Sequence, residues 1–460
     1  MENANRMGTT PIPKLIVITS LPLIVSLLVN NLYNLVDSIF VSRISEDALT
    51  GLSLAAPIQL IMIAMGSGLA VGLNAVISRA LGEKNAAEVR NTASAAMVMA
   101  VGAYLLIAAA CLVIAEPYFN WQAGGNAAIA AHGKAYIRIC MLFSLGQMIQ
   151  WVFDRFLIAT GRSSLFLATL STASVVNLIL DPILIFGYFG LPAMGTAGAA
   201  TATVIGQFAG GIWGIFLNIK RNKEIPIHFT LHISGASVRK ILQVGVPTAV
   251  LSGIMSVMGI FINTVLYGFS STAVAIYGIG QKVQNIAQIA VQGMNNALIP
   301  IIAYNYGAGK RERIRQTIRC AFLMGGVVMA VILVVMELIP DQILMLFDAS
   351  PQMMALGIPA VRLLSLSFFV GAANIIFAAV YQGFGNGNYS MYLVFVRQVA
   401  ALAPLLLLGA QLGSLNLVWL SFAAAEAIAV PVGILLYKRM GRGFFTAEPH
   451  GLPARQACAK

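Results

Sequence analysis

Charged residues are scarce in this chain. Only 10% of its 460 residues are Asp, Glu, Lys or Arg, whereas 59% are hydrophobic. A water-soluble protein of this length needs a more polar surface, so that class is excluded. Residues 15–29 and 324–336 are apolar around their whole circumference when drawn as helices. The composition therefore predicts a helical membrane protein.

Cysteine and histidine are also rare, with four residues of each. Three cysteines fall in apolar runs and Cys458 lies near the end, a spacing that matches neither a disulfide framework nor a zinc site. The histidines are expected in loops or in the tail, which excludes a relay of buried imidazoles. Nucleotide-binding and nucleophile motifs are absent as well. The sequence thus predicts neither an enzyme nor a bound organic cofactor.

Long hydrophobic runs are the main feature that remains. Twelve of them are long enough to cross a hydrocarbon core of roughly 30 Å. They lie at about residues 14–42, 47–78, 90–115, 134–158, 164–188, 195–218, 239–267, 273–303, 317–339, 357–382, 389–411 and 415–437. We therefore expect an all-α polytopic membrane protein with 12 transmembrane helices.

The two halves of the sequence repeat each other. An offset of 225 residues aligns Pro22 with Pro247, Gln59 with Gln284, Gly68 with Gly293 and Gly82 with Gly307, and an offset of 224 aligns Arg138 with Arg362 and Gly161 with Gly385. Duplicated helical halves predict two six-helix lobes related by a pseudo-twofold axis, an organisation typical of secondary transporters.

These patterns divide the chain into five segments. We expect a cytoplasmic N-terminal segment (1–13), a first lobe (14–218), a cytoplasmic linker (219–238), a second lobe (239–437) and a basic cytoplasmic tail (438–460). The net charge of +12 comes from Lys and Arg gathered in the segments on one side of the membrane, with Arg155 and Arg162 assigned to that set. This asymmetry predicts cytoplasmic termini in a bacterial inner membrane and argues against a nucleic-acid partner.

Two acids inside the apolar runs are the candidate functional residues of the first half. A carboxylate at membrane depth costs about 2.5–3.5 kcal/mol on insertion scales, so such an acid usually faces a cavity or a partner. Asp37 and Asp181 both fall in the outer half of the bilayer when about 1.5 Å is counted per helical residue. Tyr33 and Asn177 precede them by four residues and therefore share their helix faces.

These groups suggest a cation site. Pro182 lacks an N–H and leaves one backbone carbonyl of its helix free. Carboxylates that converge in a low dielectric can hold a sodium ion or a proton, and either can be exchanged for a cationic solute. In the structural alternative, Asp37 caps its helix near Arg43 and Asp181 ends a helix broken at Pro182. Pro22 allows the first helix to bend.

The second half does not repeat these acids. Ile262 and Leu405 stand at the equivalent positions. Lys282, Arg397 and Glu426 are the candidate buried charges of its spans, and the last two lie at similar depths on neighbouring spans. We expect those two to form a structural ion pair. Lys282 is expected either to line a cavity of the second half or to neutralise a helix end.

Several motifs resemble the multidrug and toxic compound extrusion (MATE) family. They are Pro22 with Asn31, Tyr33, Val36, Asp37 and Phe40, the turns that start at Gly82 and Gly307, and Asn177 with Asp181 and Pro182. The resemblance implies two lobes around a central cleft and export by alternating access, driven by inward flow of H⁺ or Na⁺. In one branch of the family the coupling ion binds in the first lobe, which corresponds here to Asp37, Asn177 and Asp181. A hydroxyl of the sixth helix often joins them, here Thr201 or Thr203.

The expected function is export of amphipathic, often cationic drugs and toxins in exchange for H⁺ or Na⁺. The expected partners are drug-like small molecules and membrane lipid, and a monomer is expected. The alternative is a lipid or lipid-linked saccharide flippase of the same superfamily. Such proteins usually need a cationic cleft for pyrophosphate, whereas the first half of this chain carries acids.

Overall fold

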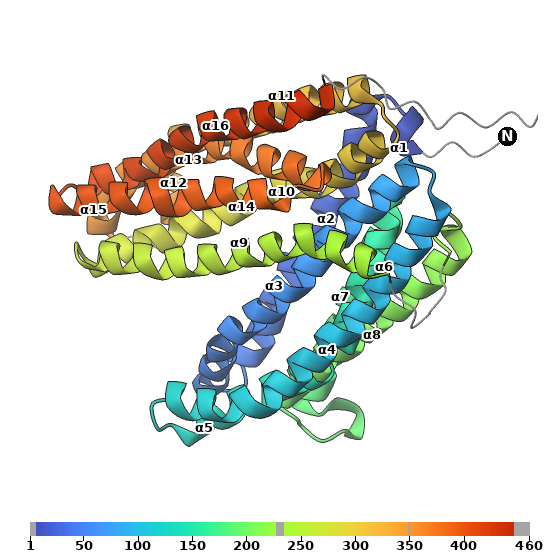
Figure 1. Ribbon diagram of the computed structural model, residues 1–460. Helices are drawn as coiled ribbons and strands as arrows, with labels where there is room; N and C mark the ends of the chain where they lie inside the picture. Colours follow the sequence, from blue (N-terminus) through green and yellow to red (C-terminus); the bar gives the residue numbers. More distant parts are fainter. Residues whose placement is uncertain (1–5, 227–233, 348–349, 446–460) are drawn as a thin grey trace, which may run out of the picture.

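The protein is built from helices. The structure is a computed structural model that describes residues 6–226, 234–347 and 350–445, and every element in these ranges is helical (Figure 1). The α-helices are α1 (Arg6–Thr9), α2 (Ile12–Ser42), α3 (Glu46–Gly82), α4 (Ala86–Gln122), α5 (Ala127–Leu142), α6 (Leu145–Ala159), α7 (Ser163–Phe186), α8 (Thr196–Arg221), α9 (Gly235–Tyr267), α10 (Ser271–Gly307), α11 (Arg311–Leu338), α12 (Pro340–Met345), α13 (Pro351–Gly383), α14 (Gly387–Phe395), α15 (Ala403–Gln411) and α16 (Leu415–Phe445). A 3₁₀ turn, η1 (Tyr188–Gly190), follows α7, and a π-helical segment, η2 (Val396–Leu402), joins α14 to α15.

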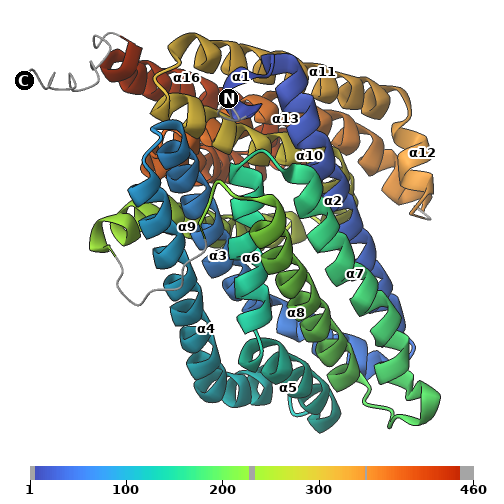
Figure 2. The same cartoon turned by 90° about the vertical axis from the view of Figure 1, so that its right-hand side faces the viewer.

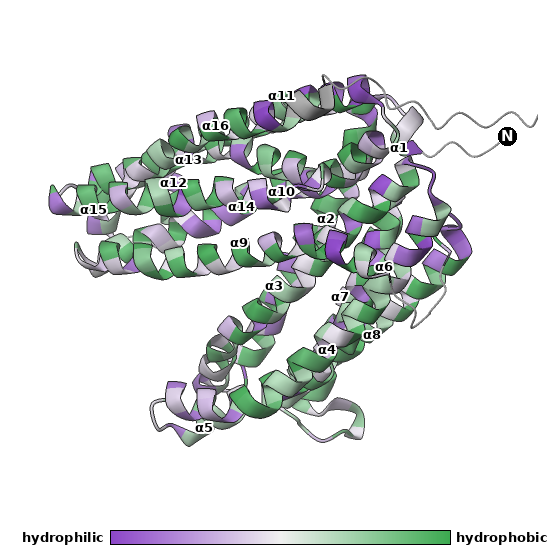
Figure 3. Ribbon diagram, viewed as in Figure 1, coloured by the Kyte–Doolittle hydropathy of each residue, from purple (hydrophilic) through white to green (hydrophobic). Residues whose placement is uncertain are grey.

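The predicted all-α membrane fold is confirmed. Within the described ranges, 11 helices are long and apolar enough to span a membrane, and the pair α5 and α6 would make the total 12. This pair is bent by 49° at residues 143–144, where the sequence predicted a single span. Hydrophobic residues dominate the middle of the helices, and hydrophilic residues gather at the end near α1 (Figure 3).

The sequence repeat reappears in the positions of the helix ends. Glu46–Gly82 of α3 becomes Ser271–Gly307 of α10 after an offset of 225 residues. Both helices start in the same way, because the Oγ of Ser45 or Ser270 accepts a hydrogen bond of 3.0 Å from the backbone N–H three residues later. The repeat therefore fixes local capping as well as the order of the helices.

The helices form two lobes, α2–α8 and α9–α16, that meet near α1 and diverge toward the opposite end (Figures 1 and 2). We call the end of the molecule that carries α1 the narrow end. There, α3 packs against α9, and α10 packs against α2 and α3. We call this contact between the lobes the seam.

Glycines allow the helices of the seam to approach closely. A Cβ added to Gly68 would lie 2.6 Å from the carbonyl oxygen of Gly245, and one added to Gly245 would lie 2.7 Å from that of Gly68. A Cβ on Gly72 would lie 2.3 Å from the carbonyl oxygen of Ile241. Since the obstructing atoms are backbone, they cannot move aside as a flexible side chain would. The seam therefore requires small residues at these positions.

Substitution of Gly72 by alanine is expected to open the seam. Overpacking costs about 1–3 kcal/mol, enough to lower the population of the closed seam by about fivefold or more. Distances between spin labels placed on α3 and α9 at the narrow end should lengthen. Gly102→Ala is the matched control, because no heavy atom lies within 4 Å of a Cβ at that position. Unchanged distances in the Gly72→Ala protein would contradict the role of this glycine.

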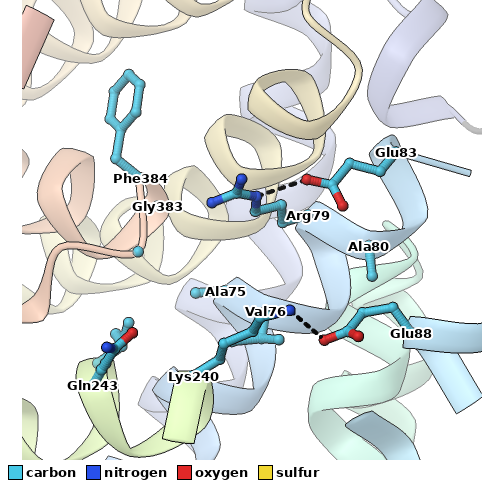
Figure 4. A pocket seen from close by; sticks show the side chains of 12 residues that line it. Ala75, Val76, Arg79, Ala80, Glu83, Glu88, Lys240, Gln243, Gly383 and Phe384 are labelled. Atoms are coloured by element: carbon cyan, nitrogen blue, oxygen red, sulfur yellow. Dashed lines mark hydrogen bonds and ion pairs between the residues drawn. The ribbon is translucent and has the colours of Figure 1, made fainter. Parts of the chain in front are cut away.

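Polar contacts close the seam at the narrow end. The Nζ of Lys240 on α9 lies 2.8 Å from an oxygen of Glu88 on α4, an ion pair that joins the two lobes (Figure 4). Beside it, Arg79 near the end of α3 pairs at 2.8 Å with Glu83, the residue that follows α3, within the first lobe. These four residues line a cavity of about 280 Å³ between the lobes. Because exposed ion pairs contribute at most about 1 kcal/mol, these contacts can break at little cost when the lobes rearrange.

The short helix α1 bridges the two lobes. Its Met7 is fully buried, and the Met7 carbonyl accepts hydrogen bonds of 3.1 Å from Asn305 and from Arg313 of the second lobe. Arg313 also donates to the carbonyl of Thr10 at 2.7 Å. The Met7 side chain lies against Gly161, between α6 and α7 of the first lobe. The segment from α1 to Thr10 is therefore part of the contact between the lobes.

Some expectations about loops and ends are corrected or lie outside the described residues. His132 lies on α5 rather than in a loop, and its Nδ1 is 3.2 Å from the Oγ1 of Thr196 on α8. Helix α16 continues to Phe445, so the expected basic tail begins inside a helix. Residues 227–233 of the linker and residues 446–460 of the tail, with Cys458, are outside the described ranges.

Candidate cation and solute site

The helix that carries Asp181 is not broken at Pro182. Helix α7 contains Pro182 in its interior and ends at Gly187, whose φ of +77° is the left-handed conformation that glycine adopts without strain. A Cβ on Gly187 would also lie 2.6 Å from the backbone nitrogen of Ala193. Asp181 thus lies inside the helix and is fully buried. The structural alternative for this acid is wrong.

Asp37 also lies inside its helix. Helix α2 passes through Pro22 without interruption and continues beyond Asp37 to Ser42. The helix closes where the backbone N–H of Arg43 donates to the carbonyl of Phe40 and that of Ile44 donates to the carbonyl of Val41. An acid is a poor cap for this end, because the last carbonyls of a helix repel a carboxylate. Asp37 is instead buried, with 7% of its surface exposed.

Asn177 joins the acid of α7 to the next helix. Its Nδ2 donates to the Oδ1 of Asp181 at 3.2 Å and to the Oγ1 of Thr203 on α8 at 3.3 Å. Asp37 lies near enough to act electrostatically on Asp181. The structure therefore brings together the acid of α2 and the acid, amide and hydroxyl of α7 and α8.

Three buried oxygens of this group have no hydrogen-bond donor among the described residues: Asp37 Oδ1, Asn177 Oδ1 and Asp181 Oδ2. Buried polar atoms in proteins nearly always have a partner, so oxygens left without one call for an explanation. A proton bound to either acid would satisfy one of these oxygens. Oxygen donors also suit a hard cation such as Na⁺. The residues present therefore fit either a proton or a sodium ion.

A cavity of about 400 Å³ adjoins these residues inside the first lobe. Tyr33, Asp37, Asn177 and Thr203 line it, with Trp151 among the aromatic side chains of its wall. Asp181 is in contact with Asn177 but is not itself part of the lining. An organic solute in the cavity would contact Asp37 directly, whereas Asp181 would act on it only by longer-range electrostatic attraction.

The structure distinguishes the two candidate threonines of α8. Thr203 bonds to Asn177 and lines the cavity. Thr201 is not part of the lining, and its hydroxyl donates to the carbonyl of Ala197 one turn earlier at 2.8 Å. The expected role of Thr201 in the site is therefore not supported by its position.

Two charged residues of the cavity were not predicted from the sequence. Asp154 and Arg155 lie on α6 and both line the cavity. Arg155 had been assigned to a cytoplasmic segment, but its Nη1 is buried and has no hydrogen-bond partner among the described residues. Their position inside the hydrophobic run at 134–158 was the signal that could have identified them.

The second lobe contains a cavity of similar size at the equivalent place. Its volume is about 410 Å³, and its lining includes Met258 and Ile262, which correspond to Tyr33 and Asp37 of the first half. Gln284 of this lining corresponds to Gln59, which lines the first cavity. The two cavities thus share position and size but differ in charge.

Arg397 and Glu426 form an ion pair beside this second cavity. The Nη1 of Arg397, which lies in η2, is 3.2 Å from Oε1 of Glu426. The Nδ2 of Asn374 donates to the other carboxylate oxygen at 2.6 Å. Lys282 lies apart from them: it is exposed on α10, and its Nζ is 5.5 Å from the ring centroid of Phe347. Lys282 does not line the cavity.

Comparison with known proteins assigns the chain to a family. The sequence model of the MatE family matches residues 22–183 and 247–406, one block in each half. The multidrug export protein MepA of Staphylococcus haemolyticus (strain JCSC1435) is 24% identical over 431 residues, which cover 92% of this chain and 93% of that protein. MepA of Staphylococcus aureus (strain MRSA252) is 22% identical over 433 residues, with coverage of 93% and 94%.

Solved structures show the same fold. A multidrug resistance MATE family transporter of the MOP superfamily, in an outward-facing conformation, superposes with a TM-score of 0.89 at 22% identity, covering 97% of this chain and all of that one. A MOP superfamily transporter from Pyrococcus furiosus superposes with a TM-score of 0.88 at 21% identity and the same coverage. Since the family model matches most of both halves, this chain belongs to the MATE family of multidrug efflux transporters.

Proposed function

We propose that the protein exports amphipathic, often cationic small molecules by alternating access and couples their export to inward movement of H⁺ or Na⁺. The observation that carries this proposal is the group of buried oxygens on Asp37, Asn177 and Asp181 that have no hydrogen-bond donor among the described residues and lie beside a cavity of about 400 Å³. A proton, a sodium ion or a cationic solute would each supply the missing positive charge.

The walls of the cavity suit an aromatic cation. Ionised Asp37 supplies the attraction, and the aromatic side chains of Tyr33, Trp151 and Phe166 offer apolar surface and π faces. A cation over an aromatic face gains about 0.5–2 kcal/mol, more when it is desolvated. Solutes with a flat aromatic body and a positive charge are therefore the best match.

Exchange follows if ion and solute compete for the same carboxylates. A cation arriving from outside would neutralise Asp37 or Asp181 and lower the affinity for a positively charged solute. A conformational change can be driven only by such a difference in affinity between states. We propose that α2 moves about Pro22 when the charge changes, because this helix carries Asp37 and lies on the seam.

The charge pattern supports an orientation with the narrow end in the cytoplasm. Arg79, Lys240, Lys310 and Arg313 lie at this end, and basic residues are favoured on the cytoplasmic side. In a bacterial inner membrane this orientation gives cytoplasmic termini and lobes that diverge outward. The outward-facing conformation of the related transporter agrees with this view. One chain contains both lobes and both cavities, so we propose that a monomer is sufficient.

The proposal is tested with purified protein in liposomes. Ethidium efflux is measured under an imposed proton gradient and, separately, under an imposed sodium gradient. Efflux driven by one gradient would identify the coupling ion. Sodium dependence would assign the oxygens of Asp37, Asn177 and Asp181 to a metal site. Absence of efflux under both gradients, with lipid flipping in the same vesicles, would replace the proposal with a flippase.

A further inference from the structure

Asp154 has no part in the function proposed above, although it lines the same cavity as Asp37. Only 2% of its surface is exposed. It lies in the second half of α6, on the side of the cavity toward the narrow end, and its partner Thr169 lies early in α7. Twelve residues of α7 separate Thr169 from Asp181, a distance of roughly 18 Å along the helix. The cavity thus has a carboxyl group toward each end of the lobe.

The contact between Asp154 and Thr169 suits both protonation states of the acid. The Oγ1 of Thr169 lies 2.6 Å from Oδ1 of Asp154 and 2.7 Å from the carbonyl oxygen of Phe166. A hydroxyl has one hydrogen and can donate to only one of these oxygens at a time. If Asp154 is ionised, the hydroxyl donates to it. If Asp154 is protonated, Asp154 donates to Thr169, and the hydroxyl donates to Phe166.

We propose that Asp154 is a second proton-binding site, which receives the coupling proton from the carboxylates near Asp37 and passes it toward the narrow end. This inference rests on the proposed function in its proton-coupled form. The hydrogen bond between Thr169 and Asp154 reverses direction when the proton arrives or leaves. Asp154 therefore keeps a hydrogen-bond partner in both of its protonation states. That matters because an unsatisfied buried group costs about 1–3 kcal/mol.

The neighbouring charge gives this site a direct effect on the solute. Arg155 is the charged side chain that acts on Asp154 among the described residues; Thr169 meets it from α7, and Gly214 approaches it from α8. When Asp154 is ionised, it balances the charge of Arg155. When Asp154 takes the proton, the guanidinium charge is left unbalanced in the cavity and repels a cationic solute. Proton and solute therefore exclude each other.

The route between the two sites is polar. Gln150 and Ser174 line the same cavity, on α6 and α7, between the ends marked by Asp154 and Asp37. A cavity of about 400 Å³ has room for several water molecules. Water and these side chains can carry a proton by successive hydrogen bonds without a large movement of the backbone.

The test compares Asp154→Asn with the wild-type protein in liposomes. Two rates are measured: ethidium efflux against its gradient, driven by protons, and ethidium exchange at equal pH on both sides. Asparagine fixes the neutral state, in which Arg155 is unbalanced, so ethidium should bind more weakly and exchange should need a higher ethidium concentration. We expect driven efflux to fall by about tenfold or more, while exchange persists at saturating ethidium. Thr169→Val should slow driven efflux and displace its pH profile, and Thr169→Ser, which keeps the hydroxyl, should restore both.

A spectroscopic readout separates this role from a structural one. Infrared difference spectra between high and low pH should contain a carboxyl band that is lost in Asp154→Asn and displaced in Thr169→Val. Normal driven efflux in Asp154→Asn, or loss of exchange even at saturating ethidium, would overturn the inference and leave the proposed function standing. A wild-type protein that responds to sodium alone would overturn the proton-coupled form and this inference together.

Discussion

Asp37→Asn and Asp181→Asn are each expected to abolish drug export, lowering ethidium efflux by about tenfold or more. Asparagine keeps the size of the side chain and removes its charge. Both positions are buried, and oxygens of both acids lack donors in the described structure. Without a carboxylate, the site loses the group that a cation and a solute would share. Drug-resistant growth and efflux from liposomes measure the effect, with the amount of protein in the membrane as the control for folding.

The two threonines of α8 provide a matched pair for the same experiment. Thr203→Val removes the hydroxyl that bonds to Asn177, whereas Thr201→Val removes one that bonds only to its own helix backbone. Efflux should fall in the first variant and remain normal in the second. Normal efflux from both aspartate variants would show that the site does not couple ion and solute.

Glu426→Gln is expected to destabilise the second lobe strongly. The side chains of Arg397 and Glu426 are only 12% and 14% exposed, so removal of one charge leaves the other buried without a counter-charge. Breaking a buried pair in this way costs about 3–5 kcal/mol. Asn374 would also lose its ionised acceptor. The measurement is the midpoint of thermal unfolding of the purified protein in detergent.

The double variant Arg397→Met with Glu426→Gln is the informative control. Replacing both charges removes the unpaired ion, so much of the lost stability should return. Lys282→Met removes an exposed charge, and it should change the free energy of unfolding by no more than about 0.5 kcal/mol. If Glu426→Gln unfolds normally but no longer transports, the ion pair serves the transport cycle rather than the stability of the lobe.

The fold could be predicted in large part from the sequence, because its two main determinants are local. Hydrophobic runs define the helices, and the repeat at offsets of 225 and 224 residues relates the halves; the ends of α3 and α10 follow it closely. The bend between α5 and α6 could not be predicted. Neither glycine nor proline marks residues 143–144, and the equivalent region of the second half is the continuous helix α13.

The candidate site was predictable where spacing along one helix determines it. Asn177 and Asp181 are four residues apart and must share a face, whereas the choice between Thr201 and Thr203 depends on how α8 is rotated against α7. That rotation is set by packing between helices. Asp154 was overlooked for a related reason, since its partner Thr169 comes from the following helix.

The burial of α1 has a practical consequence for handling the protein. Because the carbonyl of Met7 accepts hydrogen bonds from Asn305 and Arg313 on one lobe while its side chain touches Gly161 on the other, α1 is mechanically linked to the opening of the molecule. A fluorophore attached just before α1 should report that opening in real time. A bulky affinity tag fused there should perturb it, so purification tags are better placed at the C-terminus.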